Sequence, residues 1–278
     1  MAEASPSVTA RRVAAYRLSF ERAPAPYGDP DADDALAADV AAGEVVDVEA
    51  PMGRYLRGRT AFFDRMVVGA IEGGIAQLVS IGAGYDGRAI RYHKAGLRWW
   101  EVDRPGTQAD KRRRLARLGV DAGHIGFVAH DLADGGLPDA LTAAGFTPDD
   151  PALFLLEGVA VYLDPGVLTA LFGELRSVAA PGSRLALSLG TMPTSSDHAR
   201  RRLRFQAAVA RVGEPARNSI TADEATPLLA DAGWRRSDRS ERAAGAGFVV
   251  VTPVASPAGA AGVGAQSLPQ RGRGPRRD

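Results

Sequence analysis

Residues 76–89 are Ala-Gln-Leu-Val-Ser-Ile-Gly-Ala-Gly-Tyr-Asp-Gly-Arg-Ala, an apolar run that passes directly into a glycine-rich turn. The apolar run predicts a buried strand, and Gly82, Gly84 and Gly87 predict a tight turn ahead of a helix. Glycine has no Cβ and reaches positive φ without strain, so such a turn lets backbone amides come close to a bound nucleotide. The stretch therefore predicts the first strand and turn of a nucleotide-binding α/β fold.

Later apolar runs end in acidic residues. Residues 97–100 lead to Asp103, the run Ile125–Ala129 leads to Asp131, and the run Ala152–Leu156 leads to Glu157. The carboxyl ends of parallel strands meet at one edge of a sheet, so these acids should line the edge where open α/β sheets bind ligands. An acid at the end of the second strand is suited to the two ribose hydroxyls. The pattern indicates a cofactor that contains adenosine.

The identity of that cofactor is open between a nicotinamide dinucleotide and S-adenosylmethionine. The three glycines fit the spacing G-x-G-x-x-G, which by itself is weak evidence for a dinucleotide. No Tyr-x-x-x-Lys pair, no G-x-x-x-x-G-K-[ST] motif and no cysteine occurs in the chain, so hydride and phosphoryl transfer lack their usual residues. A methyl donor fits better. An NAD-dependent oxidoreductase and a non-catalytic cofactor-binding protein remain the alternatives.

Helical and strand-like segments alternate along the chain. Helices are predicted over residues 9–22, 52–72, 105–118, 165–179 and 221–232, and two closing strands over residues 234–239 and 248–251. This alternation predicts a parallel sheet with helices on both faces.

Four sequence blocks together resemble the leucine carboxyl methyltransferase family, in its bacterial branch of S-adenosylmethionine-dependent O-methyltransferases. The blocks are residues 59–64 (Arg-Thr-Ala-Phe-Phe-Asp), 77–89, 101–105 with Lys111, and 157–163 (Glu-Gly-Val-Ala-Val-Tyr-Leu). They follow the family's order and cover roughly residues 59–190. The resemblance implies a class I methyltransferase fold, which is a Rossmann-like, seven-stranded, mostly parallel sheet with an antiparallel seventh strand and an N-terminal helical lid.

The resemblance also implies roles for individual residues. Arg59 matches the arginine that pairs with the methionyl carboxylate of S-adenosylmethionine, and a guanidinium suits this task because its planar fork binds a carboxylate at two points. The other cofactor positions are Gly82 and Gly84 in the turn, Asp103 on the ribose, Asp131 and Leu132 on the adenine, and Glu157 beside the methionine part. Asp103 has a simpler alternative role, capping the helix that begins at Pro105. Where the family usually has Thr after Asp86, this chain has Gly87, which leaves the next helix without a hydroxyl cap.

The acceptor is predicted to be an oxygen, and more specifically a carboxylate. A carboxylate is ionised at neutral pH and needs no base, whereas a phenol normally needs one. Tyr162 is the side chain best placed after the fourth strand to orient the acceptor, and no histidine in the matched blocks occupies an evident base position. A hydroxyl acceptor of the phenol type is the alternative. No metal is expected.

Composition restricts the remaining possibilities. The chain has 278 residues, 45% of them hydrophobic, and lacks both a run of eighteen apolar residues and an N-terminal secretory pattern. The absence of cysteine excludes disulfides, thiolate catalysis and cysteine-bound metals, and agrees with a cytoplasmic location. The last eight residues carry a net charge of +3, so the rest of the chain carries −2. We therefore expect neither nucleic acid nor membrane as a partner. The oligomeric state is left open.

Three regions are predicted: an N-terminal helical lid region (1–75), a cofactor-binding core (76–254), and a disordered Arg-rich tail (255–278). The core carries a helical insertion at about residues 190–215 that is expected to cap the substrate. Within it Arg200, Arg201 and Arg204 share one helix face, which would attract an acidic small molecule or peptide or, more simply, face solvent.

Overall fold

A seven-stranded sheet forms the centre of the protein in the computed structural model, which describes residues 8–190, 216–237 and 247–254. The strand order is β3-β2-β1-β4-β5-β7-β6. Strand β7 pairs antiparallel with both β5 and β6, and the other pairings are parallel. The strands are β1 (Gln77–Ile81), β2 (Arg98–Asp103), β3 (Ile125–Ala129), β4 (Ala152–Leu156), β5 (Arg184–Ser188), β6 (Trp234–Arg236) and β7 (Phe248–Pro253). This arrangement confirms the predicted seven-stranded, mostly parallel sheet.

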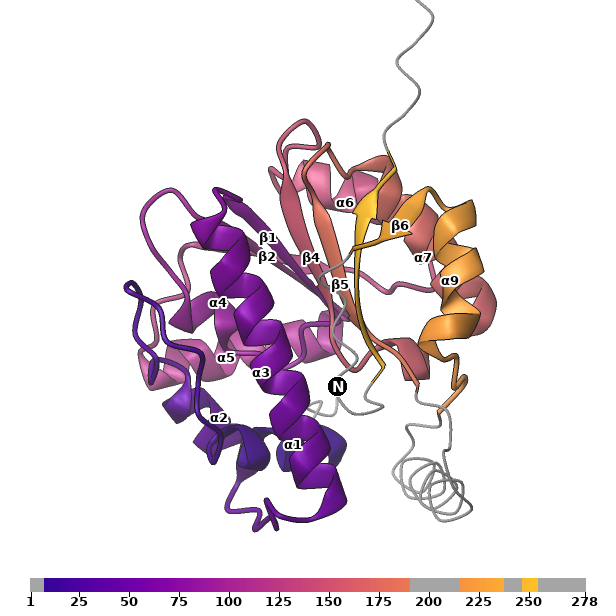
Figure 1. The fold of residues 1–278 in the computed structure, drawn as a ribbon. Coiled ribbons are helices and arrows are strands. Elements are labelled where there is room, and N and C mark those ends of the chain that lie inside the picture. Colours follow the sequence, from indigo (N-terminus) through magenta and orange to yellow (C-terminus); the bar gives the residue numbers. More distant parts are fainter. Residues whose placement is uncertain (1–7, 191–215, 238–246, 255–278) are drawn as a thin grey trace, which may run out of the picture.

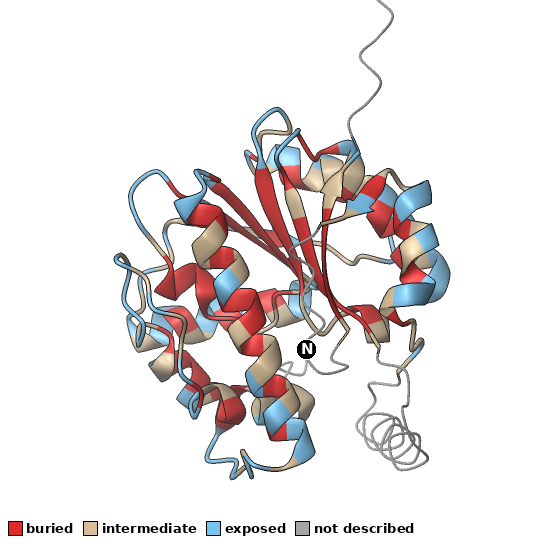
Figure 2. Cartoon of the chain, in the orientation of Figure 1, coloured by how far each residue is buried: buried red, intermediate tan, exposed pale blue. Residues whose placement is uncertain are grey.

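Helices cover both faces of the sheet (Figure 1). One face packs against α3 (Pro51–Glu72), α4 (Arg88–Arg91) and α5 (Pro105–Leu118), and the other against α6 (Leu137–Ala143), α7 (Pro165–Ser177) and α9 (Ala222–Asp231). Helix α2 (Asp34–Ala41) packs on α5. Strands β1 and β4 are buried along their whole length, which explains why they are continuous apolar runs instead of alternating ones. Figure 2 shows the same division, with buried strands and with helices that are buried on their inner sides.

The N-terminal part of the chain consists of α1 (Val8–Arg17), α2 and α3, with α1 packed against both of the others. Helix α1 is shorter than the predicted helix over residues 9–22. Its end is set by Arg22, whose Nη1 donates hydrogen bonds to the carbonyls of Arg17 (3.2 Å) and Phe20 (3.1 Å). A side chain that turns back onto these carbonyls satisfies groups that would otherwise continue the helix.

Two of the predicted regions fall partly or wholly outside the described residues. The insertion with Arg200, Arg201 and Arg204 and the tail over residues 255–278 belong to this part of the chain. Within the described ranges, no helix is both long and apolar enough to cross a membrane. The same ranges contain no group of three or more His, Asp or Glu side chains arranged to hold a metal ion.

Candidate functional site

The glycine turn after β1 places its two predicted glycines in the left-handed region, with φ +64° at Gly82 and +52° at Gly84. A Cβ on Gly82 would lie 2.4 Å from Cγ2 of Val159, so this glycine is required by the loop that packs on it after β4. Around Gly84, in contrast, a Cβ would meet no atom within 4 Å. The turn therefore leaves open space beside the backbone at Gly84, where a ligand can approach.

Asp103, the last residue of β2, is directed at this turn. Its Oδ2 accepts a hydrogen bond from the backbone N–H of Gly84 at 2.6 Å, and its Oδ1 accepts from the N–H of Arg104 at 2.7 Å. Arg104, not Asp103, is the N-cap of α5, and the cap has no side-chain hydrogen bond. Burial raises the pKa of the Asp103 carboxyl, and the two backbone N–H groups oppose that rise. The Asp103 side chain is thus held at the glycine turn and does not cap α5.

The buried ion pair of Lys111 and Glu101 stabilises the glycine turn. Lys111 on α5, which is 1% exposed, donates from Nζ to Oε2 of Glu101 at 2.6 Å and to the backbone carbonyl of Asp86 at 2.5 Å. Burial raises the pKa of Glu101, while Lys111 acts to lower it. Lys111 therefore connects the middle of β2 to the far end of the glycine turn.

Glu157 follows β4 and forms ion pairs with three guanidinium groups. Its Oε1 accepts from Nε of Arg59 at 2.9 Å and lies 3.6 Å from Nη2 of Arg17, and its Oε2 accepts from Nη1 of Arg88. Burial alone would raise the pKa of this carboxyl, but Arg88, Arg59 and Arg17 outweigh that effect and lower it to about 2. The terminal nitrogens of Arg59 lie beside Gly158, where a Cβ would be 2.7 Å from Nη1. The structure thus brings the predicted residues Arg59 and Glu157 together.

Arg88 is the centre of a buried ion network, and no motif in the sequence marks it as a site residue. It is 1% exposed, and its guanidinium pairs with Asp64 on α3 at 2.6 Å and with Asp86 at 2.8 Å, in addition to Glu157. One sequence signal was available, because Asp64 interrupts the apolar face of α3 beside Phe63 and Val67. A charged residue on an apolar helix face indicates a buried partner, since an unpaired buried charge is too costly.

Asp131 and Leu132 lie at the end of β3, next to Asp103. The N–H of His130 donates to the carbonyl of Asp103 at 2.8 Å, which joins the ends of β2 and β3. Asp131 accepts from the N–H of Ala133 at 3.0 Å through Oδ1, and Leu132 packs on the core. The two residues are therefore at the predicted sheet edge. The hydrogen bond of the Asp131 carboxylate lies within its own turn.

Tyr162 ends the short 3-10 helix η1 (Ala160–Tyr162), which lies between β4 and α7. Asn218 binds this helix at both ends: its Nδ2 donates to the carbonyl of Ala160 at 2.7 Å and to that of Leu163 at 2.6 Å. Asn218 was not predicted. It acts on a segment far away in the sequence, and no motif marks such a contact.

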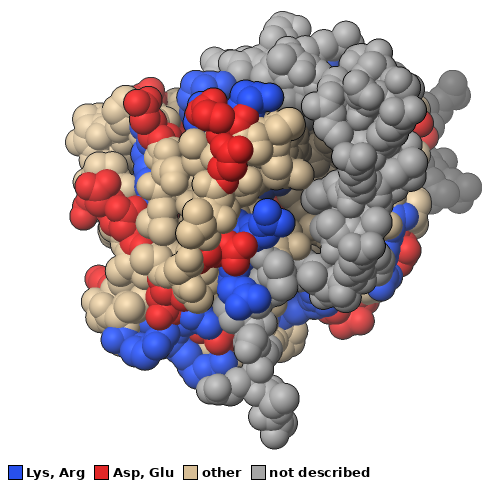
Figure 3. All heavy atoms as spheres, turned by 90° about the horizontal axis from the view of Figure 1, so that it is seen from below, with Lys and Arg blue, Asp and Glu red and all other residues tan. Residues whose placement is uncertain are grey.

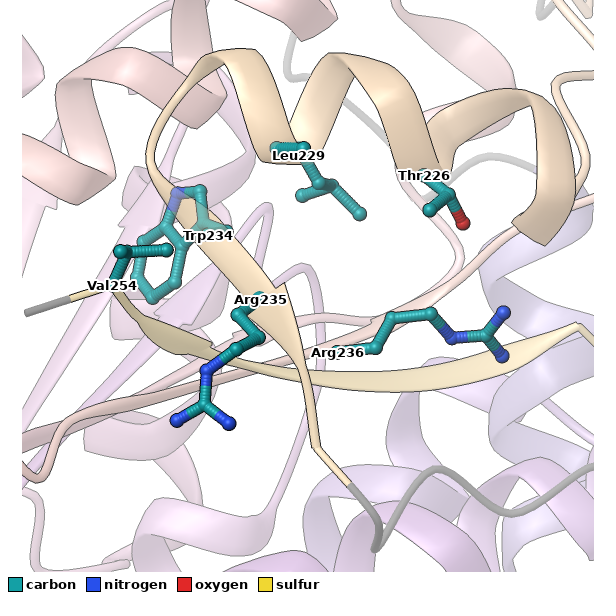
Figure 4. A pocket seen from close by; sticks show the side chains of 7 residues that line it. Thr226, Leu229, Trp234, Arg235, Arg236 and Val254 are labelled. Carbon is teal, nitrogen blue, oxygen red and sulfur yellow. The ribbon is translucent and has the colours of Figure 1, made fainter.

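A separate hollow of about 340 Å³ lies between α9, β6 and the end of β7 (Figure 4). Leu229, Trp234 and Arg235 are among the residues that line it. None of the residues predicted for the cofactor or acceptor lines it. The candidate site is therefore the glycine turn with Asp103 and the Glu157 cluster.

Comparisons with known proteins identify the family of this chain. The family model for leucine carboxyl methyltransferase matches residues 20–176. A Mycobacterium avium (strain 104) protein, provisionally named an S-adenosyl-L-methionine-dependent methyltransferase, is 36% identical over 187 residues, which cover 64% of this chain and 59% of that protein. A similarly named Mycolicibacterium smegmatis protein is 34% identical over 222 residues, covering 74% of this chain and 71% of the relative. This chain thus spans about three fifths of the length of the first of these relatives.

Solved structures show the same fold at low sequence identity. A protein provisionally named a methyltransferase from Thermobifida fusca YX superposes with a TM-score of 0.59 at 17% identity, covering 91% of this chain and 97% of the other. A DUF574 family protein from Streptomyces avermitilis gives a TM-score of 0.59 at 15% identity, covering 90% and 98%. At such identities the likeness concerns the fold alone, and that fold is the class I methyltransferase fold.

Proposed function

Because this chain belongs to the leucine carboxyl methyltransferase family, we propose that it is an S-adenosylmethionine-dependent O-methyltransferase. The observation that carries the proposal is the position of Asp103, which is bonded to the N–H of Gly84 beside open space at the carboxyl edge of the sheet. Class I sheets bind nucleotide ligands at this edge. We further propose that the acceptor is a carboxylate on a small metabolite or a peptide terminus.

The residues of the site fit the parts of that cofactor. Each oxygen of Asp103 accepts one backbone hydrogen bond and keeps lone pairs for a ribose hydroxyl. At the other end, S-adenosylmethionine carries a zwitterionic amino acid. Its carboxylate would bind Arg59, with Arg17 nearby, and its ammonium would bind Glu157, whose low pKa keeps it charged. Asp131 and Leu132 would contact the adenine.

The bound cofactor would supply an activated sulfonium methyl group. The task of this chain is then to hold the cofactor and the acceptor in line, which is catalysis by proximity and orientation. Tyr162 would orient the acceptor oxygen. A carboxylate acceptor is already ionised, so the chain need not remove a proton from it.

We propose a small acidic molecule, and not a nucleic acid or a membrane, as the partner. Seen from below in Figure 3, acidic and basic side chains are interspersed over the described part of that face. A nucleic-acid-binding face would concentrate basic side chains instead. We place the reaction in the cytoplasm, in agreement with a chain that has no cysteine.

Transfer of a tritiated methyl group tests this proposal. The protein is incubated with methyl-labelled S-adenosylmethionine and one of two panels, carboxylates (short peptides with a free C-terminus and simple organic acids) or phenols. We expect label only with carboxylates, in a product that releases volatile methanol in mild base. The rate should stay nearly flat from about pH 6 to 9, because a carboxylate is ionised throughout that range.

The control variant is Asp103→Ala, which should abolish incorporation at the same cofactor concentration. A base-stable product whose rate of formation rises through about pH 7 would show instead that a hydroxyl is methylated with the help of a base. Preference for NADH over S-adenosylhomocysteine in a calorimetric titration would contradict the cofactor assignment itself.

A further inference from the structure

The backbone conformation at Gly87 does not require a glycine. This residue precedes α4 with φ −102° and ψ 2°, a conformation that residues with a side chain also adopt. A Cβ at this position, however, would lie 2.0 Å from Oδ2, 2.2 Å from Cβ and 2.3 Å from Cγ of Asp33. The space that a side chain at position 87 would need is therefore filled by Asp33.

Asp33 is fixed in this place by charge as well as by shape. It is 3% exposed, and its Oδ1 lies 3.3 Å from Nη2 of Arg22 and 3.6 Å from Nε of Arg91. Arg22 belongs to the same N-terminal segment as Asp33, whereas Arg91 belongs to α4. The carboxylate thus joins the segment to the helix that follows the glycine turn.

A second contact joins the same two parts of the chain a few residues earlier. The N–H of Asp29 donates to the carbonyl of Arg91 at 3.1 Å. At Gly28, a Cβ would lie 1.9 Å from that carbonyl oxygen. The N-terminal segment is therefore seated directly on the backbone of α4.

This docking has a consequence at the candidate cofactor site. Arg17, at the start of the segment, donates from Nη1 to the carbonyl of Tyr85 in the glycine turn at 3.3 Å and lies 3.6 Å from Glu157. Residues 17–33 thus hold a guanidinium beside the end of the site that would take the amino-acid part of the cofactor. Arg22 connects Arg17 to Asp33 at the other end of the segment, because its Nη1 donates to the carbonyl of Arg17 at 3.2 Å and its Nη2 lies 3.3 Å from Oδ1 of Asp33.

We propose that Asp33 is a positioning residue for cofactor binding. Its side chain fills the space beside Gly87 and docks residues 17–33 on the glycine turn and α4. Arg17 then faces the amino-acid end of the ligand. The inference rests on the cofactor site proposed above.

Calorimetric titration of S-adenosylhomocysteine and of adenosine into four proteins tests it. These are the wild type, Gly87→Thr, Asp33→Gly and the double variant. Gly87→Thr displaces Asp33 and should weaken S-adenosylhomocysteine binding by about tenfold or more, but adenosine binding by less than about twofold, because adenosine has no amino-acid part. Asp33→Gly removes the docking carboxylate itself and should weaken S-adenosylhomocysteine binding to a similar extent. The double variant should bind about as weakly as either single variant, because both changes remove the same contacts.

Matched controls are Gly166→Thr, at a helical glycine with no atom within 4 Å of the added Cβ, and Asp31→Gly, at an exposed position of the same segment. Both should bind like the wild type. Unchanged S-adenosylhomocysteine binding by Gly87→Thr or by Asp33→Gly, equal losses for both ligands, or losses that add up in the double variant would each overturn the proposal. A wild type that binds neither ligand would instead remove the cofactor site on which the inference depends.

Discussion

Arg59 illustrates how much a single side chain contributes to this site. Its Nε is bonded to Glu157, and its terminal nitrogens lie over Gly158, where no Cβ stands in the way. A guanidinium bonds in several directions within one plane, so it can hold Glu157 with one edge and a ligand carboxylate with another. A lysine ammonium in the same place is a compact point charge without this planar fork.

We therefore predict that Arg59→Lys weakens binding of S-adenosylhomocysteine by about 1–3 kcal/mol, the scale of charged hydrogen bonds, although the charge is kept. Adenosine, which lacks the carboxylate, should bind both proteins equally. Arg57→Lys is the matched control, because Arg57 lies on the same helix with its side chain 45% exposed. Calorimetry with both ligands gives the answer, and equal losses for the two ligands would assign Arg59 a purely structural role.

Single residues also mark the limit of what the sequence could predict. The glycine turn, Asp103 and Glu157 belong to a motif with fixed spacing, and the structure brings them to one edge of the sheet. Arg88 and Asp64 are 24 positions apart, and no local pattern predicts that their side chains meet inside the protein. The pairing of Asp33 with Gly87 could not be predicted either, because the sequence shows only that a hydroxyl cap is absent. The cap is partly replaced by Asp86, whose Oδ1 accepts from the N–H of Arg88 at 3.0 Å.

At the level of elements, prediction succeeded where local signals determine where an element begins and ends. Helix α5 has the predicted bounds Pro105–Leu118, since a proline in its first turn and Gly119 with φ +68° at its end act locally. The predicted end of α1 was wrong because Arg22 and its partners Asp33 and Asp34 are tertiary contacts. The 3-10 helix η1 likewise depends on a distant residue, Asn218, which bonds both of its ends.

This dependence of η1 leads to a prediction about turnover. Asn218→Ala removes both side-chain hydrogen bonds but leaves the backbone ones that Arg217 and Asn218 donate to the carbonyl of Val161. The helix that carries Tyr162 should therefore be held less firmly, and kcat should fall by about tenfold. Affinity for S-adenosylhomocysteine should not change, because the glycine turn and Asp103 are untouched. Steady-state kinetics and calorimetry on Asn218→Ala, with Ser219→Ala as the neighbouring control, separate these effects. Reduced cofactor affinity together with unchanged kcat would refute the assignment.

For the whole molecule, the buried ion network connects parts that are distant in the chain. Arg88 joins α3 through Asp64, the glycine turn through Asp86 and the end of β4 through Glu157. Coulombic attraction to Arg88 and its neighbours lowers the pKa of Glu157 to about 2 and also lowers that of Asp86, despite the burial of both. Removing one member of such a network leaves a buried charge without its partner, at a typical cost of about 3–5 kcal/mol.

The lowered pKa values of Glu157 and Asp86 predict that the protein becomes less stable in acid. A carboxyl whose pKa is lower in the folded than in the unfolded state stabilises the fold above its unfolded pKa, about 4.3 for Glu, and this contribution is lost as the pH falls towards the folded value. The free energy of unfolding should therefore decrease between about pH 5 and 2. Glu157→Gln should be less stable at pH 7 and should show a shallower decrease, by about 1 kcal/mol or more over that range.

Urea unfolding at a series of pH values measures this effect, with the exposed Glu49→Gln as the control. A Glu157→Gln protein whose stability depends on pH as steeply as that of the wild type would show that Glu157 does not take part in the linkage.

The mutual pairing of Arg59 and Glu157 also determines which small ions this site can admit. A ligand carboxylate that binds Arg59 lies close to the carboxylate of Glu157, so binding is favoured when the same ligand also brings a cation to that glutamate. Acetate, phosphate and chloride bring only negative charge, and simple amines bring only positive charge. An amino acid joined to a nucleoside brings both. The Arg59–Glu157 pair would therefore favour a dipolar molecule over the simple salts of a cell.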